Sequence, residues 1–145
     1  MRSSLFLFLP DELQLHIIIA LPIADILNFR LVCRTLYTLV ALNGSIIARY
    51  HAKHSLPSYT LQLYPSPHPT DISFHHLCCI WHRCLVVTKL ATNLATYATK
   101  EIFLRTTEAQ LLDFEPQYRR MRRRLVPIIF AIFHFFEKYR DLHVS

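Results

Sequence analysis

The sequence predicts an all-α protein, and three observations support this. First, the 145 residues include a single glycine, Gly44, whereas the tight turns that join antiparallel strands favour glycine. Second, prolines stand at the starts of apolar stretches, where the missing N–H of a first helical residue costs nothing. Third, apolar residues in the second half recur at helical spacing. We therefore expect helices and no sheet.

Four short helices are expected in a first unit, residues 1–54. Pro10 and Pro22 each look like a first helical residue, and acidic residues follow in each first turn, where the helix dipole favours negative charge. Asn43-Gly44 is expected to stop the third helix, and Ser45 to cap the fourth. The expected helices span residues 10–21, 22–29, 33–42 and 46–53.

Residues 55–71 are expected to form a proline-rich connector. Pro57, Pro65, Pro67 and Pro69 interrupt regular structure, and Ser, Thr and His fill the gaps, which is typical of a semi-extended linker. The connector is the expected boundary between the first unit and a helical segment of unassigned role, residues 72–145.

A long helix is expected over residues 72–105, capped by Thr70 or Asp71. Its polar side chains form one narrow stripe, and apolar side chains occupy the opposite face, so we expect the helix to be buried on most sides. The polar stripe consists of His82, Lys89, Asn93, Thr96 and Lys100, and the apolar face of Leu77, Ile80, Trp81, Cys84, Val87, Ala91, Leu94 and Ala98.

A further helix is expected after Thr107-x-x-Gln110, which has the spacing of a capping box. Glu115-Pro116 is expected to restart or kink it, and Pro127 to kink it again before the apolar segment 128–136. One stripe along this helix is apolar: Phe114, Tyr118, Met121 and Leu125.

The first unit resembles an F-box. The pattern consists of Leu9-Pro10-Asp11-Glu12-Leu13, then Ile17 and Leu21, then Asp25-Ile26-Leu27, and finally Arg30-Leu31-Val32-Cys33-Arg34. Where many F-boxes have an aromatic residue three positions after the cysteine, this chain has Leu36, with Tyr37 following. Residues 82–91 and 133–140 resemble the region after the F-box in many fungal F-box proteins. Such proteins are longer, so we expect an N-terminal portion or a truncated member.

The resemblance implies an adapter. F-box proteins dock onto a Skp-family linker, and through it a cullin, in SCF-type ubiquitin ligases, while another segment holds a protein substrate, here unknown. The docking face would be helix-to-helix apolar packing in which a few anchors supply the affinity. The residues that the resemblance assigns to this face are Leu9, Pro10, Leu13, Ile17, Leu21, Ile26, Leu31, Val32, Cys33, Leu36 and Tyr37.

Catalysis, cofactors and a metal site are not expected. With one glycine, the chain lacks the loops that cradle phosphates and dinucleotides. Cys33 has no activating neighbour in the sequence and is interpreted as a small buried hydrophobe. His75, Cys78, Cys79 and His82 share one helix face, but along about 10 Å of one straight helix they cannot surround a single ion.

A run of arginines accounts for much of the net charge of +6: Arg119, Arg120, Arg122, Arg123 and Arg124. We interpret it as a solvated helix face. The alternative is a small helical interaction protein, or one that binds a membrane surface, acting through residues 119–136. Nucleic acid is not expected, because no aromatic residues are interleaved with the basic ones.

An intracellular location, cytoplasmic or nuclear, is expected. No secretory leader is visible, because the apolar stretch near the start is short and is cut off at Pro10. Cys33, Cys78, Cys79 and Cys84 are therefore expected as free thiols of a reducing compartment.

Overall fold

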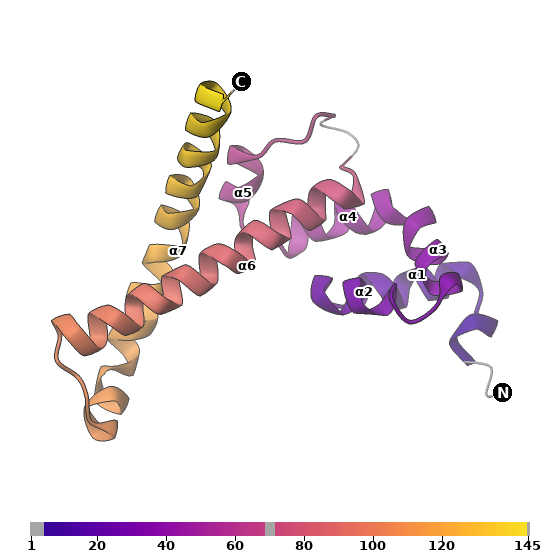
Figure 1. Ribbon diagram of the computed structural model, residues 1–145. Coiled ribbons are helices and arrows are strands. Elements are labelled where there is room, and N and C mark those ends of the chain that lie inside the picture. Colours follow the sequence, from indigo (N-terminus) through magenta and orange to yellow (C-terminus); the bar gives the residue numbers. More distant parts are fainter. Residues whose placement is uncertain (1–4, 69–71, 145) are drawn as a thin grey trace. The chain divides into compact units, whose positions relative to one another are not determined.

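The computed structural model describes residues 5–68 and 72–144, and these form seven α-helices and no strands (Figure 1). The all-α prediction is therefore confirmed. The chain divides into two compact units, Met1–Trp81 and His82–Ser145, whereas the sequence predicted a boundary in residues 55–71. The α-helices are α1 (Asp11–Ala20), α2 (Ile23–Phe29), α3 (Arg34–Leu42), α4 (Gly44–His54), α5 (Ser58–Leu63), α6 (Phe74–Tyr97) and α7 (Glu108–Val144).

Prolines precede the first two helices, each of which begins one residue later than predicted. Pro10 and Pro22 are the N-cap residues of α1 and α2, with extended ψ values of 147° and 151°. The carbonyl of Pro10 accepts a hydrogen bond from the backbone N–H of Gln14 at 3.0 Å, which closes the first turn of α1. Asp11 and Glu12 lie in that turn, as predicted, where the positive end of the helix dipole stabilises them.

The junction of α3 and α4 differs from the prediction. Ser45 does not cap α4, because the helix already begins at Gly44. Instead the Nδ2 of Asn43 donates to the carbonyl of Leu39 at 2.9 Å and completes the end of α3. A Cβ at position 44 would lie 3.0 Å from the Cβ of Phe74, the first residue of α6, so a larger residue there would press on the start of that helix.

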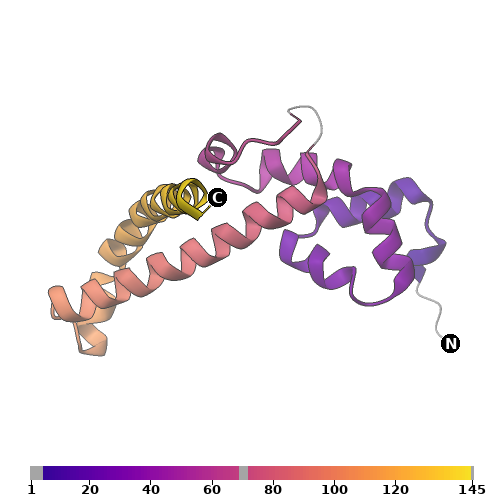
Figure 2. The same cartoon turned by 45° about the horizontal axis from the view of Figure 1, so that its top comes forward.

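Helices α1 to α4 surround one small core (Figures 1 and 2). Each contributes one fully buried aliphatic side chain, and burying each stabilises the fold by about 1.5–3 kcal/mol. Partly buried side chains from η1 (Leu5–Phe8), from α1 to α3 and from the start of α6 pack around this cluster. The four central residues are Ile18, Ile26, Val40 and Ile47.

The extended connector predicted for residues 55–71 is wrong over its first half, because α5 forms there. Pro57 precedes this helix as Pro10 precedes α1, and its carbonyl accepts a hydrogen bond from Thr60 Oγ1 at 2.6 Å. Thr60 is fully buried and Leu56 is buried too, so tertiary packing holds this helix in place. The predicted caps Thr70 and Asp71 lie outside the described residues; inside them, Ser73 Oγ accepts from the backbone N–H of His76 at 3.1 Å.

The second unit is a helical hairpin. Within it, α6 and the π-helix that follows it bury a row of small and medium side chains at a spacing of four residues: Val87, Ala91, Ala95 and Thr99. The prediction that this helix is buried on most sides is wrong, because Leu85, Leu90, Leu94 and Tyr97 are 43–61% exposed. Of the predicted polar stripe, only Thr96 is half-buried.

The end of α6 widens into a π-helix, Ala98–Ile102, instead of continuing to residue 105 as predicted. The backbone N–H of Phe103 donates to the carbonyl of Ala98 at 2.9 Å, which is the i to i+5 bond of this geometry. Leu104 then adopts φ 52°, a left-handed conformation that costs a non-glycine residue roughly 1–2 kcal/mol. The chain reverses direction at this point.

The predicted capping box is confirmed at the start of α7. The backbone N–H of Gln110 donates to Thr107 Oγ1 at 3.4 Å, and Gln110 Oε1 accepts from the N–H of Thr107 at 3.3 Å. The helix then continues through Pro116 and Pro127, so neither proline ends it. The kink expected at Pro127 stays a prediction.

Polar contacts tie α7 to α6 in an antiparallel arrangement. Arg83 Nε donates to both carboxylate oxygens of Glu137 at 3.2 Å, and Tyr118 OH lies 3.4 Å from Thr96 Oγ1. The predicted apolar stripe is half-buried on α7, and Phe130, further along, is fully buried. The stripe residues are Phe114, Tyr118, Met121 and Leu125.

Candidate partner-docking surfaces

The first unit leaves five of the predicted docking residues open to solvent. Their exposed fractions are 44–75%, which is high for large apolar side chains in a folded domain. Pro10 and Cys33 are exposed as well. The five large residues are Leu13, Ile17, Leu31, Val32 and Tyr37.

These residues come from three elements. Leu13 and Ile17 are four residues apart, so they share one face of α1. Leu31 and Val32 lie in the turn between α2 and α3, and Tyr37 is on α3. A shallow groove brings Leu31, Cys33 and Tyr37 together, with Arg30, Arg34 and Thr38 along its lining. An apolar surface with basic side chains beside it is suited to a partner helix that carries acidic residues at its rim.

Two of the predicted docking residues lie in the core instead. Ile26 is 0% and Leu36 is 8% exposed, so neither side chain offers much surface to a partner in this conformation. Ile26 is on the inner face of a helix of seven residues, where sequence alone does not decide which side faces inward. Leu9 and Leu21 are half-buried.

Cys33 was interpreted as a small buried hydrophobe, and this is wrong. It is the exposed N-cap residue of α3, with an extended backbone (φ −158°, ψ 165°). Position 33 therefore presents its thiol at the surface, in the groove beside Leu31 and Tyr37.

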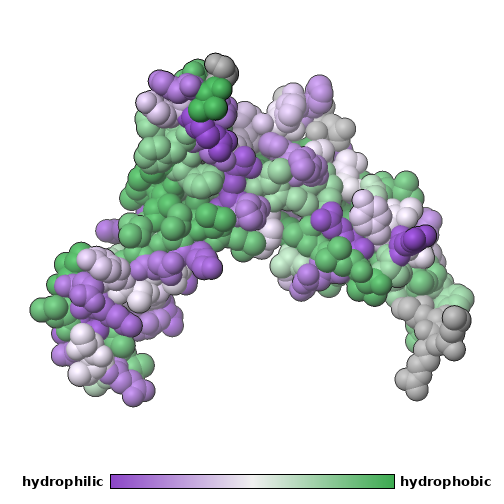
Figure 3. All heavy atoms as spheres, viewed as in Figure 1, coloured by the Kyte–Doolittle hydropathy of each residue, from purple (hydrophilic) through white to green (hydrophobic). Residues whose placement is uncertain are grey.

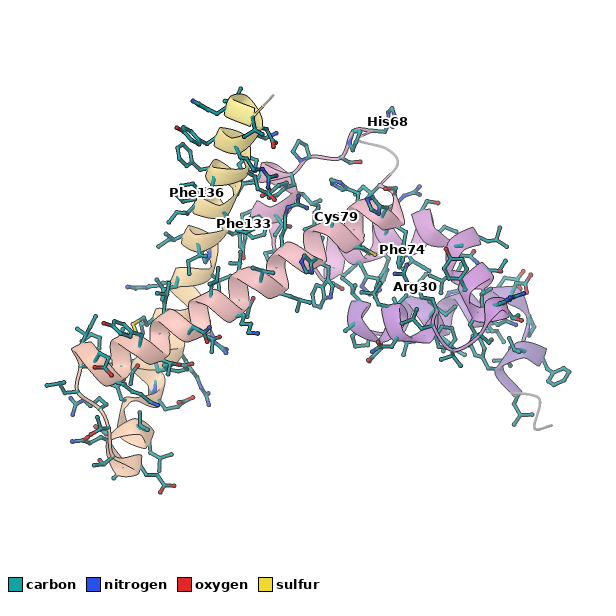
Figure 4. The ribbon with its side chains drawn as sticks, viewed as in Figure 1. Arg30, His68, Phe74, Cys79, Phe133 and Phe136 are labelled. Carbon is teal, nitrogen blue, oxygen red and sulfur yellow. The ribbon has the colours of Figure 1, made fainter. Side chains whose placement is uncertain are left out.

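Two polar residues that the docking prediction did not include hold this surface in place. Gln14 is buried, and its Nε2 donates to the carbonyl of Leu9 at 2.8 Å, which fixes the segment before α1. Arg30 lies with its guanidinium 5.6 Å from the ring centroid of Phe74, a cation–π contact between the end of α2 and the start of α6 (Figure 4). A polar residue inside the apolar run Leu13–Leu15 is the signal that identifies Gln14.

The cysteine and histidine side chains at the start of α6 do not form a chelating set. Cys79 Sγ lies 3.5 Å from His75 Nε2, but no group of three or more potential ligands occurs in the described residues. Burial raises the pKa of the Cys78 thiol, with a smaller opposing effect from Arg30, and burial raises the pKa of Cys84 to about 11. Protonated thiols are poor nucleophiles and poor metal ligands.

The arginine run forms an exposed face of α7, as the sequence predicted. Arg119 Nε donates to Glu115 Oε1 at 2.8 Å. Within the described part of the chain, the other four arginines have no ion-pair partner: Arg120, Arg122, Arg123 and Arg124. In the same part, no helix has a segment long and apolar enough to cross a bilayer.

Comparison with known families decides what the first unit is. The family model for F-box-like domains matches residues 6–50, from η1 to the middle of α4. The chain contains an F-box-like domain. No curated protein and no solved structure matches the chain. F-box domains are typically protein-interaction modules rather than enzymes, in keeping with the exposed apolar side chains on α1 and around α3.

Proposed function

We propose that the protein is the F-box adapter, or substrate-receptor subunit, of an SCF-type cullin ubiquitin ligase. In this role the F-box-like domain docks onto a Skp-family linker, the linker contacts a cullin, and the rest of the protein holds a protein substrate. The observation that carries the proposal is the F-box-like match over residues 6–50, within which five large apolar residues of the predicted docking face stay exposed. The protein acts by binding rather than by catalysis, in the cytoplasm or nucleus.

The docking surface consists of the open positions only. Leu13 and Ile17 offer one stripe, and the groove at Leu31 and Tyr37 offers a second anchor site. Binding energy concentrates in a few buried anchors, so the loss of two of them weakens an interface by several kcal/mol. Ile26 and Leu36 support this surface from the core.

Co-purification with a Skp-family linker tests the proposal. We expect the wild-type chain to co-purify with the linker. A Leu31→Asp, Val32→Asp variant should not co-purify, because each change introduces a charge where the proposed interface is apolar. Both side chains are more than 70% exposed, so the variant keeps its fold, which circular dichroism verifies. A matched control is Leu90→Asp, Leu94→Asp, which places the same charges on exposed leucines of α6 outside the F-box-like domain.

The outcomes of this co-purification distinguish an F-box adapter from a membrane-surface protein. If the folded wild-type chain does not co-purify with the linker, or if the Leu31 and Val32 variant binds as well as the control, the proposed function is wrong. A membrane-surface protein acting through residues 119–136 predicts instead vesicle binding that weakens with salt and is indifferent to changes at Leu31 and Val32.

A further inference from the structure

The second half of α7 carries an apolar stripe that the hairpin does not cover. Its residues alternate at spacings of three and four, which is the a/d pattern of a two-helix coiled coil. Five of them are 48–77% exposed, and Leu125, at the near end, is half-buried. Figure 3 shows apolar surface gathered along α7. We call this set the α7 seam: Leu125, Ile128, Ile132, Phe135, Tyr139 and Leu142.

From Ile128 on, the seam lies on a different side of α7 from Phe130 and Glu137, the residues that hold this part of the hairpin. Phe130 is fully buried and Glu137 binds Arg83, and both occupy the f position of the heptad, opposite a and d. The hairpin can therefore stay formed while a partner covers the seam.

Two aromatic side chains of the seam are held in place by stacking before any partner binds. The rings of Phe135 and Tyr139 stack with centroids 6.3 Å apart, and Tyr139 stacks on His143 at 4.1 Å. Rings held against one another lose less rotamer freedom when a partner covers them, so less of the binding energy is lost.

We propose that the α7 seam is the interface of an antiparallel homodimer. The seam is complementary to itself when a second copy runs in the opposite direction. Ile132 of one copy then faces Phe135 of the other, Ile128 faces Tyr139, and Leu125 faces Leu142. Each layer occurs twice by symmetry and pairs an aliphatic side chain with an aromatic one or with another leucine, so no large side chain meets its own copy.

Charge selects the antiparallel direction. In a parallel pair the arginine runs of the two copies lie side by side and repel each other. In the antiparallel pair the two Arg122 residues are separated by about 35 Å along the axis. This is several times the Debye length of about 8 Å at physiological salt, so the repulsion is screened.

The size of the seam also suits a dimer. Aromatic side chains bury 150–250 Å² each, so the seam offers on the order of 500 Å² per copy. The pair then buries on the order of 1,000 Å², the lower bound for a specific interface. Phe136, which lies beside the seam at an e position, is 62% exposed and adds to this area.

Light scattering coupled to size-exclusion chromatography of the full chain tests the proposal. Across the micromolar range we expect the mass to rise from 17.1 kDa toward twice that value. In the double variant Ile132→Glu, Phe135→Glu, the protein concentration at which half of the chain is dimeric should rise on the order of 100-fold, because two central layers are lost. Leu90→Glu, Leu94→Glu, on the exposed face of α6, should dimerise like the wild type. A chain that stays monomeric throughout, or a control as impaired as the seam variant, overturns the proposal.

Disulfide trapping tests the direction. The four native cysteines are replaced by serine, and one preparation carries Ile128→Cys while another carries Tyr139→Cys. Mixing the two should give the mixed disulfide. Ile128→Cys alone should give none, because its two copies lie about 16 Å apart along the axis and a disulfide needs Cα atoms within about 7 Å. Efficient homodisulfides at position 128 would overturn the antiparallel assignment. Dimerisation should be unchanged in Leu31→Asp, Val32→Asp, so this inference and the proposed function fail independently.

Discussion

At the residue scale, buried polar side chains of the first unit fix the segments that carry the proposed docking surface. Gln14 is 5% exposed, and its Nε2 donates to the carbonyls of Leu9 at 2.8 Å and Leu7 at 3.4 Å. Leaving this buried amide without an acceptor would cost about 1–3 kcal/mol. Arg30 in turn stacks on Phe74. Leu31 and Val32, which lie in a turn, are exposed, as a docking role would require. Ile26 is buried, because the inner face of a short helix is set by the neighbours that pack on it, whereas Cys33 is exposed although the sequence predicted it to be buried.

His51 makes the stability of the first unit depend on pH. It is 3% exposed, and its Nδ1 lies 2.6 Å from Ser55 Oγ. Burial lowers the pKa of His51 below its usual value of 6.5, the positive charge of His54 lowers it further, and the backbone of Ile19 opposes both. The unfolded chain therefore binds a proton near pH 6 that the folded chain does not, so stability is lost as the pH falls through 6.5 toward the folded pKa.

Replacement of His51 by glutamine should flatten this dependence. Between pH 7.5 and 5.5 the free energy of unfolding of the wild type should fall, by up to about 1.4 kcal/mol per pH unit for one proton. His51→Gln should lose less, whatever its stability at neutral pH. Chemical denaturation at each pH measures both slopes, with the exposed His16→Gln as the control. Equal slopes in all three chains would show that His51 does not carry the dependence.

At the element scale, local signals decide where helices begin, and packing decides what lies between them. The helix starts near Pro10, Pro22 and Thr107 could be predicted, because a residue at a helix start interacts only with the first turn of its own helix. Helix α5 and the π-helix were not, because they depend on residues distant in sequence. Thr60 is fully buried by its surroundings, and Thr99 is buried and donates to the carbonyl of Ala95 at 2.7 Å. The sequence composition had predicted a connector where α5 forms, and an α-helix that continues through Thr99, where the structure has the π-helix.

The Thr107 capping box should contribute measurably to the stability of the hairpin. Thr107→Ala removes the acceptor for the N–H of Gln110, and loss of an N-cap side chain costs about 0.5–2 kcal/mol. Thr92→Ala is the matched control, since Thr92 Oγ1 only bonds back to the carbonyl of Thr88 inside α6 and alanine is the better helix former. Thermal unfolding followed by circular dichroism should place Thr107→Ala below the wild type and Thr92→Ala at or above it. The same shift in both variants would contradict the role of the cap.

At the scale of the whole molecule, the protein has two cores joined by one continuous helix. The first unit contains the buried cluster of α1 to α4 together with α6 as far as Trp81. The second buries Phe130 and a seam of α6 that includes Val87 and Ala95. Two small cores of this kind bury less surface per residue than one large core, so each unit is marginally stable. Occupation of the partner surfaces proposed for the two units would stabilise the folded state by mass action, because binding covers exposed apolar side chains.

Separate cores predict separate unfolding. Phe130→Ala removes the largest fully buried side chain, at a cost of about 3–5 kcal/mol that falls on the second unit. Hydrogen exchange followed by mass spectrometry should show lost protection in α7 and in α6 beyond Trp81, with α1 to α4 unchanged. Ile18→Ala should give the converse pattern, since Ile18 lies in the core of the first unit. If either change removed protection from both units equally, the continuous helix α6 would be transmitting unfolding between them, and the molecule would unfold as one cooperative body despite its two cores.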